Sequence, residues 1–256
     1  MSEELVKKEK SFSDSLTADL LEIDSKHGLP VRYNIPKFVN NCLYLLNNNK
    51  NLADFSKING GMAKIKAGMI RSAFVGLDFM SNEVYLIPYG NDLNFQISYK
   101  GATKLAKKYS IKPISVIYAE VVRQGDDIKY GTNENGQYIE YSPLPFNEGS
   151  IRGAFAEVVY SDGSRQYCVM TKAEIDKCRN ASKTKGAVWS QWYEEMAKKT
   201  VLKRLCKSID IDFDNAEQRV AFEEREDFAE EVEPEIVDDV YADCEVIESE
   251  TVEVDE

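Results

Sequence analysis

The most constraining feature of the chain is the stretch from Gly76 to Lys108, in which two short β patterns lead directly into a helical pattern. Glu83–Tyr89 is rich in β-branched and aromatic residues, as expected for a strand. The Gly-Asn-Asp that follows suits a tight turn, and Leu93–Ser98 alternates apolar and polar residues like a returning strand. From Tyr99 onwards the period becomes helical. The sequence therefore predicts a hairpin that feeds a helix.

The predicted helix has two contrasting faces, because residues three or four apart share one side. The apolar face comprises Tyr99, Ala102, Leu105, Ala106 and Tyr109, and the cationic face comprises Lys100, Lys104 and Lys107, with Lys108 beside them. Lysines on a helix can form an ordinary solvated face. These four have no acidic residue among them, so we favour a surface that binds anions.

A second cationic helix is predicted from about Ala187 to Ser208. One of its sides is aromatic in the first half and cationic in the second; it contains Trp189, Trp192, Tyr193, Met196, Thr200, Lys203, Arg204 and Lys207, with Lys199 at its edge. Cations one turn apart suit a phosphate backbone, and adjacent rings suit stacking on bases. The alternative for the two tryptophans is burial in the core, the commoner fate of this residue.

Two weaker groups of cations complete the candidate site. Lys64 and Arg71 share one side of a helix predicted over Met62–Val75, where they either contact an anion or are ordinary solvated charges. Lys183 and Lys185 lie in a basic segment that is predicted to be flexible.

The residues of the two helical blocks also resemble a known family. The first block reads YLIPYGN and then ISYKGATKLAKK, and the second reads WYEEMAKKTVLKRLCK at Trp192–Lys207, about a hundred residues further on. In sequence, order and spacing they are similar to the signatures of the phage RecT family of single-strand DNA annealing recombinases, which is related to the phage lambda beta protein. The resemblance covers roughly Ile35 to Ile211.

The resemblance implies a function and a set of partners. It implies ATP-independent annealing of complementary single strands during homologous recombination, without a cofactor and without catalytic residues. The implied partners are single-stranded DNA, the annealed duplex and further copies of the chain in a ring or helical filament, together with a phage exonuclease and the host single-strand-binding protein. Two alternatives stay open, a passive single-strand-binding protein of another fold and an adaptor that acts through its acidic tail.

The rest of the chain predicts an α+β fold, since helices are followed by strands with one intervening helix and then by helices again. The predicted strands are Ile114–Val122, Ile128–Thr132, Tyr138–Tyr141, Gly153–Tyr160 and Arg165–Met170, and Thr171 with Glu174 forms a capping box that starts a helix. The resemblance implies that the strands form a small twisted antiparallel sheet backed by helices.

Three parts are expected along the chain. Residues 1–33 form an N-terminal arm, either flexible or a helix that docks on a neighbour, because Phe12, Leu16, Leu20 and Ile23 recur at helical spacing. Residues 34–213 form the DNA-binding and annealing core. Residues 214–256 form an acidic tail that is expected to be largely disordered.

The net charge of −12 is unevenly distributed along the 256 residues. Glu217–Glu256 holds 18 acidic residues and two arginines, a charge of −16, whereas Met1–Ala216 carries +4. A mildly basic body is compatible with nucleic-acid binding once the tail is set aside. The tail either solubilises the protein or docks a partner through the apolar residues of Val232–Tyr241.

Several other classes find little support in the sequence. Five scattered cysteines and a single histidine, His27, favour neither a zinc site nor a disulfide framework, and the P-loop spacing is absent. The best carboxylate cluster for a metal-dependent nuclease, formed by Asp78, Glu83 and Asp92 with Lys100, is weak. The charged N-terminus shows no signal peptide and no apolar run could span a membrane. We therefore expect a cytoplasmic protein that is not an enzyme and has no metal.

Overall fold

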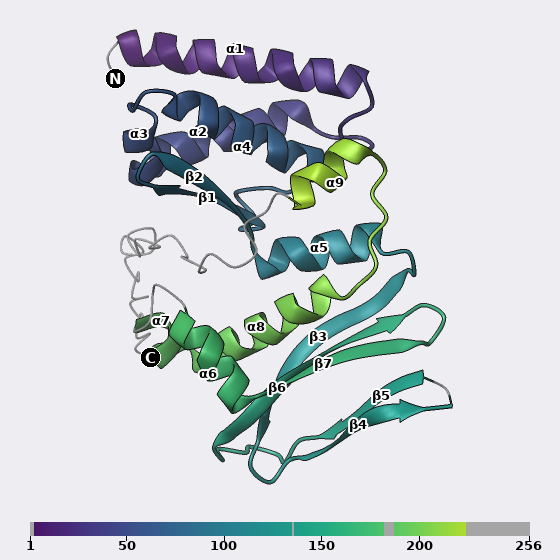
Figure 1. Cartoon of the computed structure of the whole chain (residues 1–256). Coiled ribbons are helices and arrows are strands. Elements are labelled where there is room, and N and C mark those ends of the chain that lie inside the picture. The colour runs from purple at the N-terminus through teal and green to yellow at the C-terminus, as the bar shows by residue number, and fades with distance from the viewer. Residues whose placement is uncertain (1–2, 135, 182–186, 224–256) are drawn as a thin grey trace, which may run out of the picture.

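The computed structural model describes residues 3–134, 136–181 and 187–223 (Figure 1). The helices are α1 Glu3–Ser25, α2 Ile35–Asn48, α3 Lys50–Phe55, α4 Gly61–Val75, α5 Tyr99–Tyr109, α6 Lys172–Ala181, α7 Ala187–Gln191, α8 Tyr193–Lys207 and α9 Ala216–Glu223. The strands are β1 Val84–Tyr89, β2 Asp92–Ile97, β3 Ile114–Arg123, β4 Asp127–Asn133, β5 Gly136–Ser142, β6 Ile151–Tyr160 and β7 Arg165–Thr171. This arrangement confirms the predicted α+β class.

The elements stack in layers from one end of the molecule to the other (Figure 1). Helices α1 to α4, the β1–β2 hairpin and α9 form one end, and α5 and α8 lie in the middle. Helix α8 then covers the three-stranded antiparallel sheet, whose strand order is β3-β6-β7. The separate β4–β5 hairpin lies at the far end, where its β5 strand contacts β7. The strands therefore form two hairpins and one small sheet.

The hairpin and its following helix form as predicted. Leu86 of β1 pairs with Phe95 of β2 in an antiparallel register, and Gly90 makes the turn with a φ of +56°. The hydroxyl of Ser98 accepts a hydrogen bond of 3.1 Å from the backbone N–H of Gly101 and so caps α5. A Cβ at Gly101 would lie 2.1 Å from the carbonyl oxygen of Glu83, so only glycine permits this approach of helix to hairpin.

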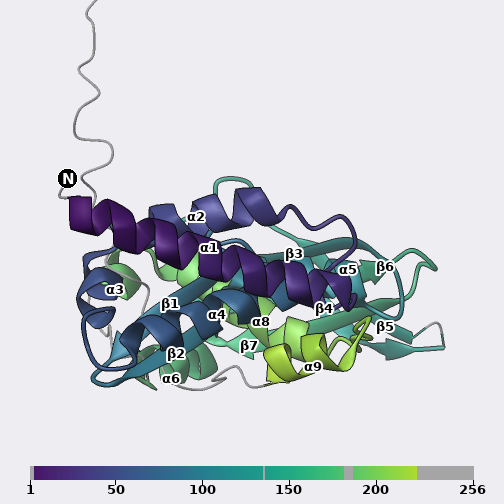
Figure 2. The ribbon, with the colours of Figure 1, turned by 90° about the horizontal axis from the view of Figure 1, so that it is seen from above.

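The N-terminal segment is a helix docked on its own chain. Leu16 and Leu20 of α1 are fully buried, Phe12 is 8% exposed, and Ile23 packs against the same core. Figure 2 shows α1 lying across α2 and α4. In the described structure this segment is therefore a helix packed on its own chain.

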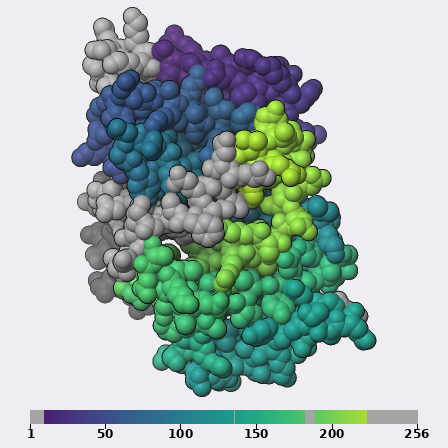
Figure 3. All heavy atoms as spheres, in the orientation of Figure 1, coloured from purple at the N-terminus to yellow at the C-terminus, as the bar shows by residue number. Residues whose placement is uncertain are grey.

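The folded part extends further toward the C-terminus than the boundary predicted at residue 214. Helix α9 packs on α4, where Arg71 Nε donates a hydrogen bond of 2.8 Å to the Ala221 carbonyl. Gln218 is fully buried, and the ring centroids of Phe213 and Phe222 lie 5.1 Å apart. In the space-filling view, α9 lies against the blue surface of the N-terminal helices (Figure 3). Helix α9, which lies within the expected acidic tail, is thus packed on the folded part, and residues 224–256 lie outside the described residues.

The buried side chains form two large clusters joined by α5. One lies among α1 to α4, the β1–β2 hairpin and α9, and receives Leu105 and Tyr109 from α5. The other lies between α8 and the β3-β6-β7 sheet, and receives Ala106. Since the apolar face of α5 is used on both sides, the position of its cationic face is set by the two cores together.

Candidate nucleic-acid interface

The four lysines of α5 all lie on the exposed side of the helix. Lys104 forms an ion pair of 2.6 Å with Glu83 and donates a hydrogen bond of 2.9 Å to the Gly76 carbonyl, so it also ties α5 to the hairpin. Lys108 donates to the Tyr109 hydroxyl at 2.8 Å, and partial burial lowers the pKa of its ammonium group. Lys100 and Lys107 complete an exposed cationic face.

The second predicted helix is not continuous, because the chain breaks at Trp192. Helix α7 ends at Gln191 and α8 begins at Tyr193, while Trp192 has a φ of −125° and a ψ of 42°, outside the helical region. The helical phase of Trp189 therefore does not carry over into α8, and the predicted single stripe does not exist.

The two tryptophans consequently have different environments. Trp189 is 3% exposed and packs edge-on to Tyr193, with ring centroids 5.8 Å apart, inside the core beneath α8. This burial favours the alternative expectation for Trp189, a place in the core, over a contact with DNA. Trp192 is 56% exposed, which is unusual for so large an aromatic side chain.

Trp192 forms one wall of a pocket between α5, β3 and α8. The pocket has a volume of about 380 Å³; Tyr99, Ala119, Trp192, Met196, Leu202, Glu195, Lys198 and Lys199 line it. Three predicted residues are thus brought together: Tyr99 from α5, Lys199 from α8 and Trp192 from the break before α8. We call this group the aromatic pocket.

The cations of the aromatic pocket are held close to its apolar walls. Lys199 is only 7% exposed, so its aliphatic stem is packed against its neighbours. Lys198 pairs with Glu120 of β3 at 2.9 Å, and Glu195 of the same helix lies within 4.0 Å. The half-exposed ring of Trp192 in this pocket suits a ligand with a π face, as a nucleotide base has.

The cations in the second half of α8 lie outside the aromatic pocket, and each has a different environment. Arg204 lies 3.5 Å from Glu174 of α6, and hydrogen bonds from Thr171 lower the pKa of that carboxyl group. Lys207 lines a different pocket, at the end of α8. Lys203 is half-buried. Of the predicted α8 cations, only Lys199 lines the aromatic pocket.

Of the two weaker groups of predicted cations, one binds other elements of the fold and the other lies outside the described residues. Lys64 pairs with Asp92 at 2.8 Å and also donates to the Asn91 carbonyl, which fastens α4 to the hairpin turn. Arg71 lies 4.5 Å from the centre of the Phe95 ring and holds α9. Lys183 and Lys185 lie outside the described residues.

The carboxylates considered for a nuclease each bind another side chain. Glu83 binds Lys104, Asp92 binds Lys64, and Asp78 accepts hydrogen bonds of 2.8 and 3.1 Å from the Asn41 side chain. Within residues 3–134, 136–181 and 187–223, no three His, Cys, Asp or Glu side chains are grouped as metal ligands. None of the helices in this part of the chain is long and apolar enough to cross a membrane.

The residues predicted for the interface did not include Ala119, Glu195, Lys198 and Leu202 of the aromatic pocket. Ala119 belongs to β3, and its contribution depends on how the sheet packs on α8. Lys198 offered one signal, since it lies beside Lys199 and one turn after Glu195. The other residues of the aromatic pocket are brought together by tertiary packing, which the sequence does not reveal.

An α+β chain with a cationic helix beside an exposed aromatic pocket belongs to the class of candidate single-stranded nucleic-acid-binding proteins. The sequence model of the RecT family matches residues 36–238, and the chain belongs to this family. The chain is also similar to Protein RecT of Escherichia coli (strain K12), with 29% identity over 151 residues. The alignment covers 56% of this chain and 55% of that protein, so the chain spans about half the length of the curated relative it matches.

Proposed function

We propose that this protein is a DNA single-strand annealing protein of homologous recombination that works without ATP. It binds single-stranded DNA, accepts a complementary strand and holds the nascent duplex within an assembly of several copies. The proposal includes no catalytic residue and no cofactor, because pairing of complementary strands is itself downhill. Family membership supports the general function, and the aromatic pocket supports the way in which DNA is held.

The observation that carries the proposal is the exposed ring of Trp192 beside Tyr99 and Lys199. Rings bind bases of any sequence, because every base offers a π face. The exposed lysines of α5 offer charge to the phosphates, which neutralises the repulsion felt by a second strand. Contacts to the backbone leave base edges free, so that pairing between strands provides the sequence specificity.

The proposed contact is tested with the Trp189→Phe variant, in which Trp192 is the sole tryptophan. We expect its fluorescence to change when a short oligothymidine binds. We also expect Trp192→Ala, in the otherwise unchanged chain, to weaken binding by about 1–3 kcal/mol, the range for a lost stacking contact. Trp192→Phe should retain most of the affinity.

Tyr44→Ala is the matched control, since Tyr44 is an aromatic residue on α2 that is 53% exposed and lies outside the aromatic pocket. It should bind DNA like the unmodified protein. Equal affinities for Trp192→Ala, Tyr44→Ala and the unmodified chain, all folded, would remove the aromatic pocket from the DNA site.

A phage exonuclease and the host single-strand-binding protein remain proposed partners, with the distal acidic tail as the proposed contact. This contact is tested by pull-down of each partner with the full chain and with a chain ending at Glu223, which lacks the distal tail. Equal capture by both chains would locate the contact in the folded part.

A further inference from the structure

The loop between β5 and β6 projects an apolar segment into solvent at one end of the molecule. Phe146 is fully exposed, at 101%, and Leu144 is 52% exposed, with an exposed proline before each of them. Phe146 also has a φ of +55°, a backbone conformation that is unfavourable for a residue with a bulky side chain. Two unfavourable features at one residue point to a function.

The loop is held firmly in this conformation by Asp126. The carboxylate of Asp126 accepts hydrogen bonds from the backbone N–H of Arg123 and Leu144, from the Asn147 amide and from the Tyr141 hydroxyl, at 2.7 to 3.0 Å. The Asn147 side chain in turn accepts a hydrogen bond of 2.8 Å from the Gly149 N–H. The exposed ring is therefore presented on a preorganised loop, which lowers the entropic cost of binding.

The chemistry of the loop favours a protein partner over nucleic acid. Residues 143–150 contain no Lys or Arg and carry the exposed carboxylate of Glu148. The nearby Arg123 is occupied by the Gly149 carbonyl and by Glu194. Residues 143–150 therefore offer no cation of their own to a phosphate backbone, whereas an exposed aromatic residue on a rigid loop is typical of a protein-binding anchor.

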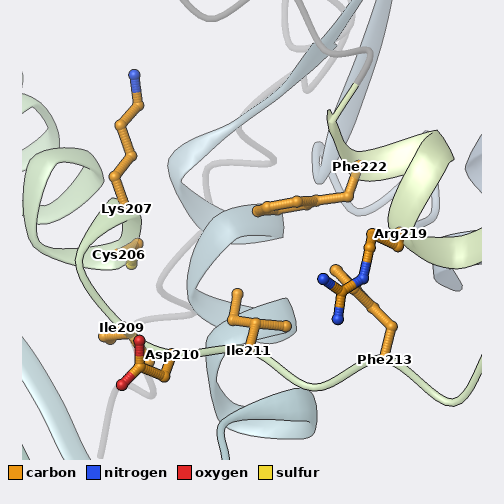
Figure 4. Close-up of a pocket in the computed structure, with 8 residues that line it drawn as sticks. All are labelled: Cys206, Lys207, Ile209, Asp210, Ile211, Phe213, Arg219 and Phe222. Carbon is orange, nitrogen blue, oxygen red and sulfur yellow. The ribbon is translucent and has the colours of Figure 1, made fainter.

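A second pocket lies on the same molecule, at the C-terminal end of α8 (Figure 4). This pocket of about 190 Å³ has the apolar side chains of Ile209, Ile211, Phe213 and Phe222 in its lining. Figure 4 shows Arg219 pointing into the space between Ile211, Phe213 and Phe222. The pocket has room for about one aromatic ring, and the guanidinium of Arg219 lies beside that space.

The loop cannot fill the pocket of its own copy. Arg123 binds both the loop and Glu194 in the first turn of α8, whereas the pocket is built on Cys206 and Lys207 in the last turn. A helix of this length separates the two by about 20 Å. Figure 1 likewise places the β5–β6 loop at the sheet end of the molecule and α9 toward the opposite end.

We propose that the β5–β6 loop of one copy inserts Phe146 into the pocket between α8 and α9 of the next copy. The ring packs among Ile211, Phe213 and Phe222, and the carboxylate of Glu148 faces the guanidinium of Arg219. Because two different surfaces meet, the contact is heterologous and propagates into a ring or an open filament. The contact needs no DNA, so its test is independent of the proposed function.

The first test measures assembly of the full chain by sedimentation without DNA. Phe146→Ala should weaken the association constant about 10-fold or more, as for an interface anchor. Folding is not at risk, since the side chain makes no buried contact. Tyr130→Ala is the control, because Tyr130 is 51% exposed on the neighbouring β4–β5 hairpin, and it should assemble normally.

A charge exchange tests the orientation of the contact. Glu148→Arg should weaken assembly, and adding Arg219→Glu should restore it, whereas Glu140→Arg on β5 should have no effect. A chain that stays monomeric at every concentration, equal assembly of Phe146→Ala and the unmodified protein, or no restoration in the double variant would overturn the proposal.

Photo-cross-linking identifies the receptor directly. With p-benzoylphenylalanine in place of Phe146, we expect cross-links to the segment 206–222 of another copy, distinguished by mixing isotopically labelled and unlabelled chains. Cross-links within one copy, to the distal acidic tail or to any other segment would contradict the assignment.

Discussion

At the scale of single residues, the two tryptophans show how similar sequence contexts lead to opposite roles. Both occupy an aromatic cluster at the start of a cationic block. The chain leaves the helical conformation at Trp192, which turns that side chain outward, whereas Trp189 stays in the core at 3% exposure. The difference in burial therefore makes Trp189 a core residue and leaves Trp192 as the candidate binding residue.

This difference predicts opposite effects of the same substitution. Trp189→Ala should lower the free energy of unfolding by about 3–5 kcal/mol, as for truncation of a core aromatic side chain. Trp192→Ala should change it by about 0.5 kcal/mol or less, as at exposed positions. Chemical denaturation measures both. A large loss of stability in Trp192→Ala would mean that the ring is buried in the protein as it exists in solution.

The backbone at Phe146 makes a second prediction at this scale. Glycine adopts positive φ without a steric penalty, so Phe146→Gly should be more stable than Phe146→Ala by about 1 kcal/mol. The alanine variant keeps the unfavourable conformation and is the matched control. Equal unfolding free energies for the two variants would show that position 146 does not hold a positive φ in solution.

Asp126 provides a pH-dependent prediction. Burial raises the pKa of its carboxyl group, but the hydrogen bonds donated to it outweigh burial and lower the pKa from 3.8 to about 2. The folded state therefore favours the ionised form, and this stabilisation is present above pH 3.8 and is lost as the pH falls toward 2.

Asp126→Asn should remove this pH dependence. The variant should be less stable than the unmodified chain at neutral pH, by about 1–3 kcal/mol for the lost charged acceptor. The difference in unfolding free energy should shrink steadily between pH 4 and pH 2. A difference that stays constant through this range would show that the carboxylate is not the acceptor.

At the scale of secondary-structure elements, the features fixed by local chemistry were predictable and those fixed by packing were not. The β1–β2 hairpin, the cap of α5 and the capping box are local; in the last, Thr171 N–H donates to Glu174 at 2.9 Å. The break at Trp192 and the position of Ala119 in the aromatic pocket depend on contacts distant in sequence. Helix α9 had one local signal, since Asn215 accepts a hydrogen bond of 2.8 Å from the Gln218 N–H.

The lysines of α5 carry the prediction that belongs to this scale. Replacing Lys100, Lys104 and Lys107 by alanine should weaken single-strand binding and flatten its dependence on salt, by up to about one unit of slope for each lost phosphate contact. The matched control replaces Lys57, Lys112 and Lys129, three exposed lysines on other elements. An unchanged slope in the folded α5 variant would remove this helix from the DNA site.

At the scale of the whole molecule, the position of α9 predicts different properties for two truncated chains. A chain ending at Asn215 loses the helix that Arg71 holds and exposes Phe213, so it should be less stable. A chain ending at Glu223 keeps α9 and loses 16 acidic residues and one arginine. It should bind single-stranded DNA more tightly, most clearly at low salt, where charges act over longer distances.

The affinity of each truncated chain for a labelled oligonucleotide is measured across a range of salt concentrations. Thermal unfolding measures the stability of the same chains. Equal DNA affinity of the full chain and the chain ending at Glu223 at low salt would exclude electrostatic competition by the distal tail. Equal stability of the two truncated chains would show that α9 does not support the fold.

The proposed activity brings complementary strands together, and it is measured as the rate of strand pairing. Two complementary oligonucleotides, one carrying a fluorophore and the other a quencher, are mixed with the full chain in the absence of any nucleotide. We expect pairing to become faster as the protein is added and Trp192→Ala to reduce this acceleration. Slower pairing, as expected for a passive single-strand coat, would show that the protein is not an annealing protein.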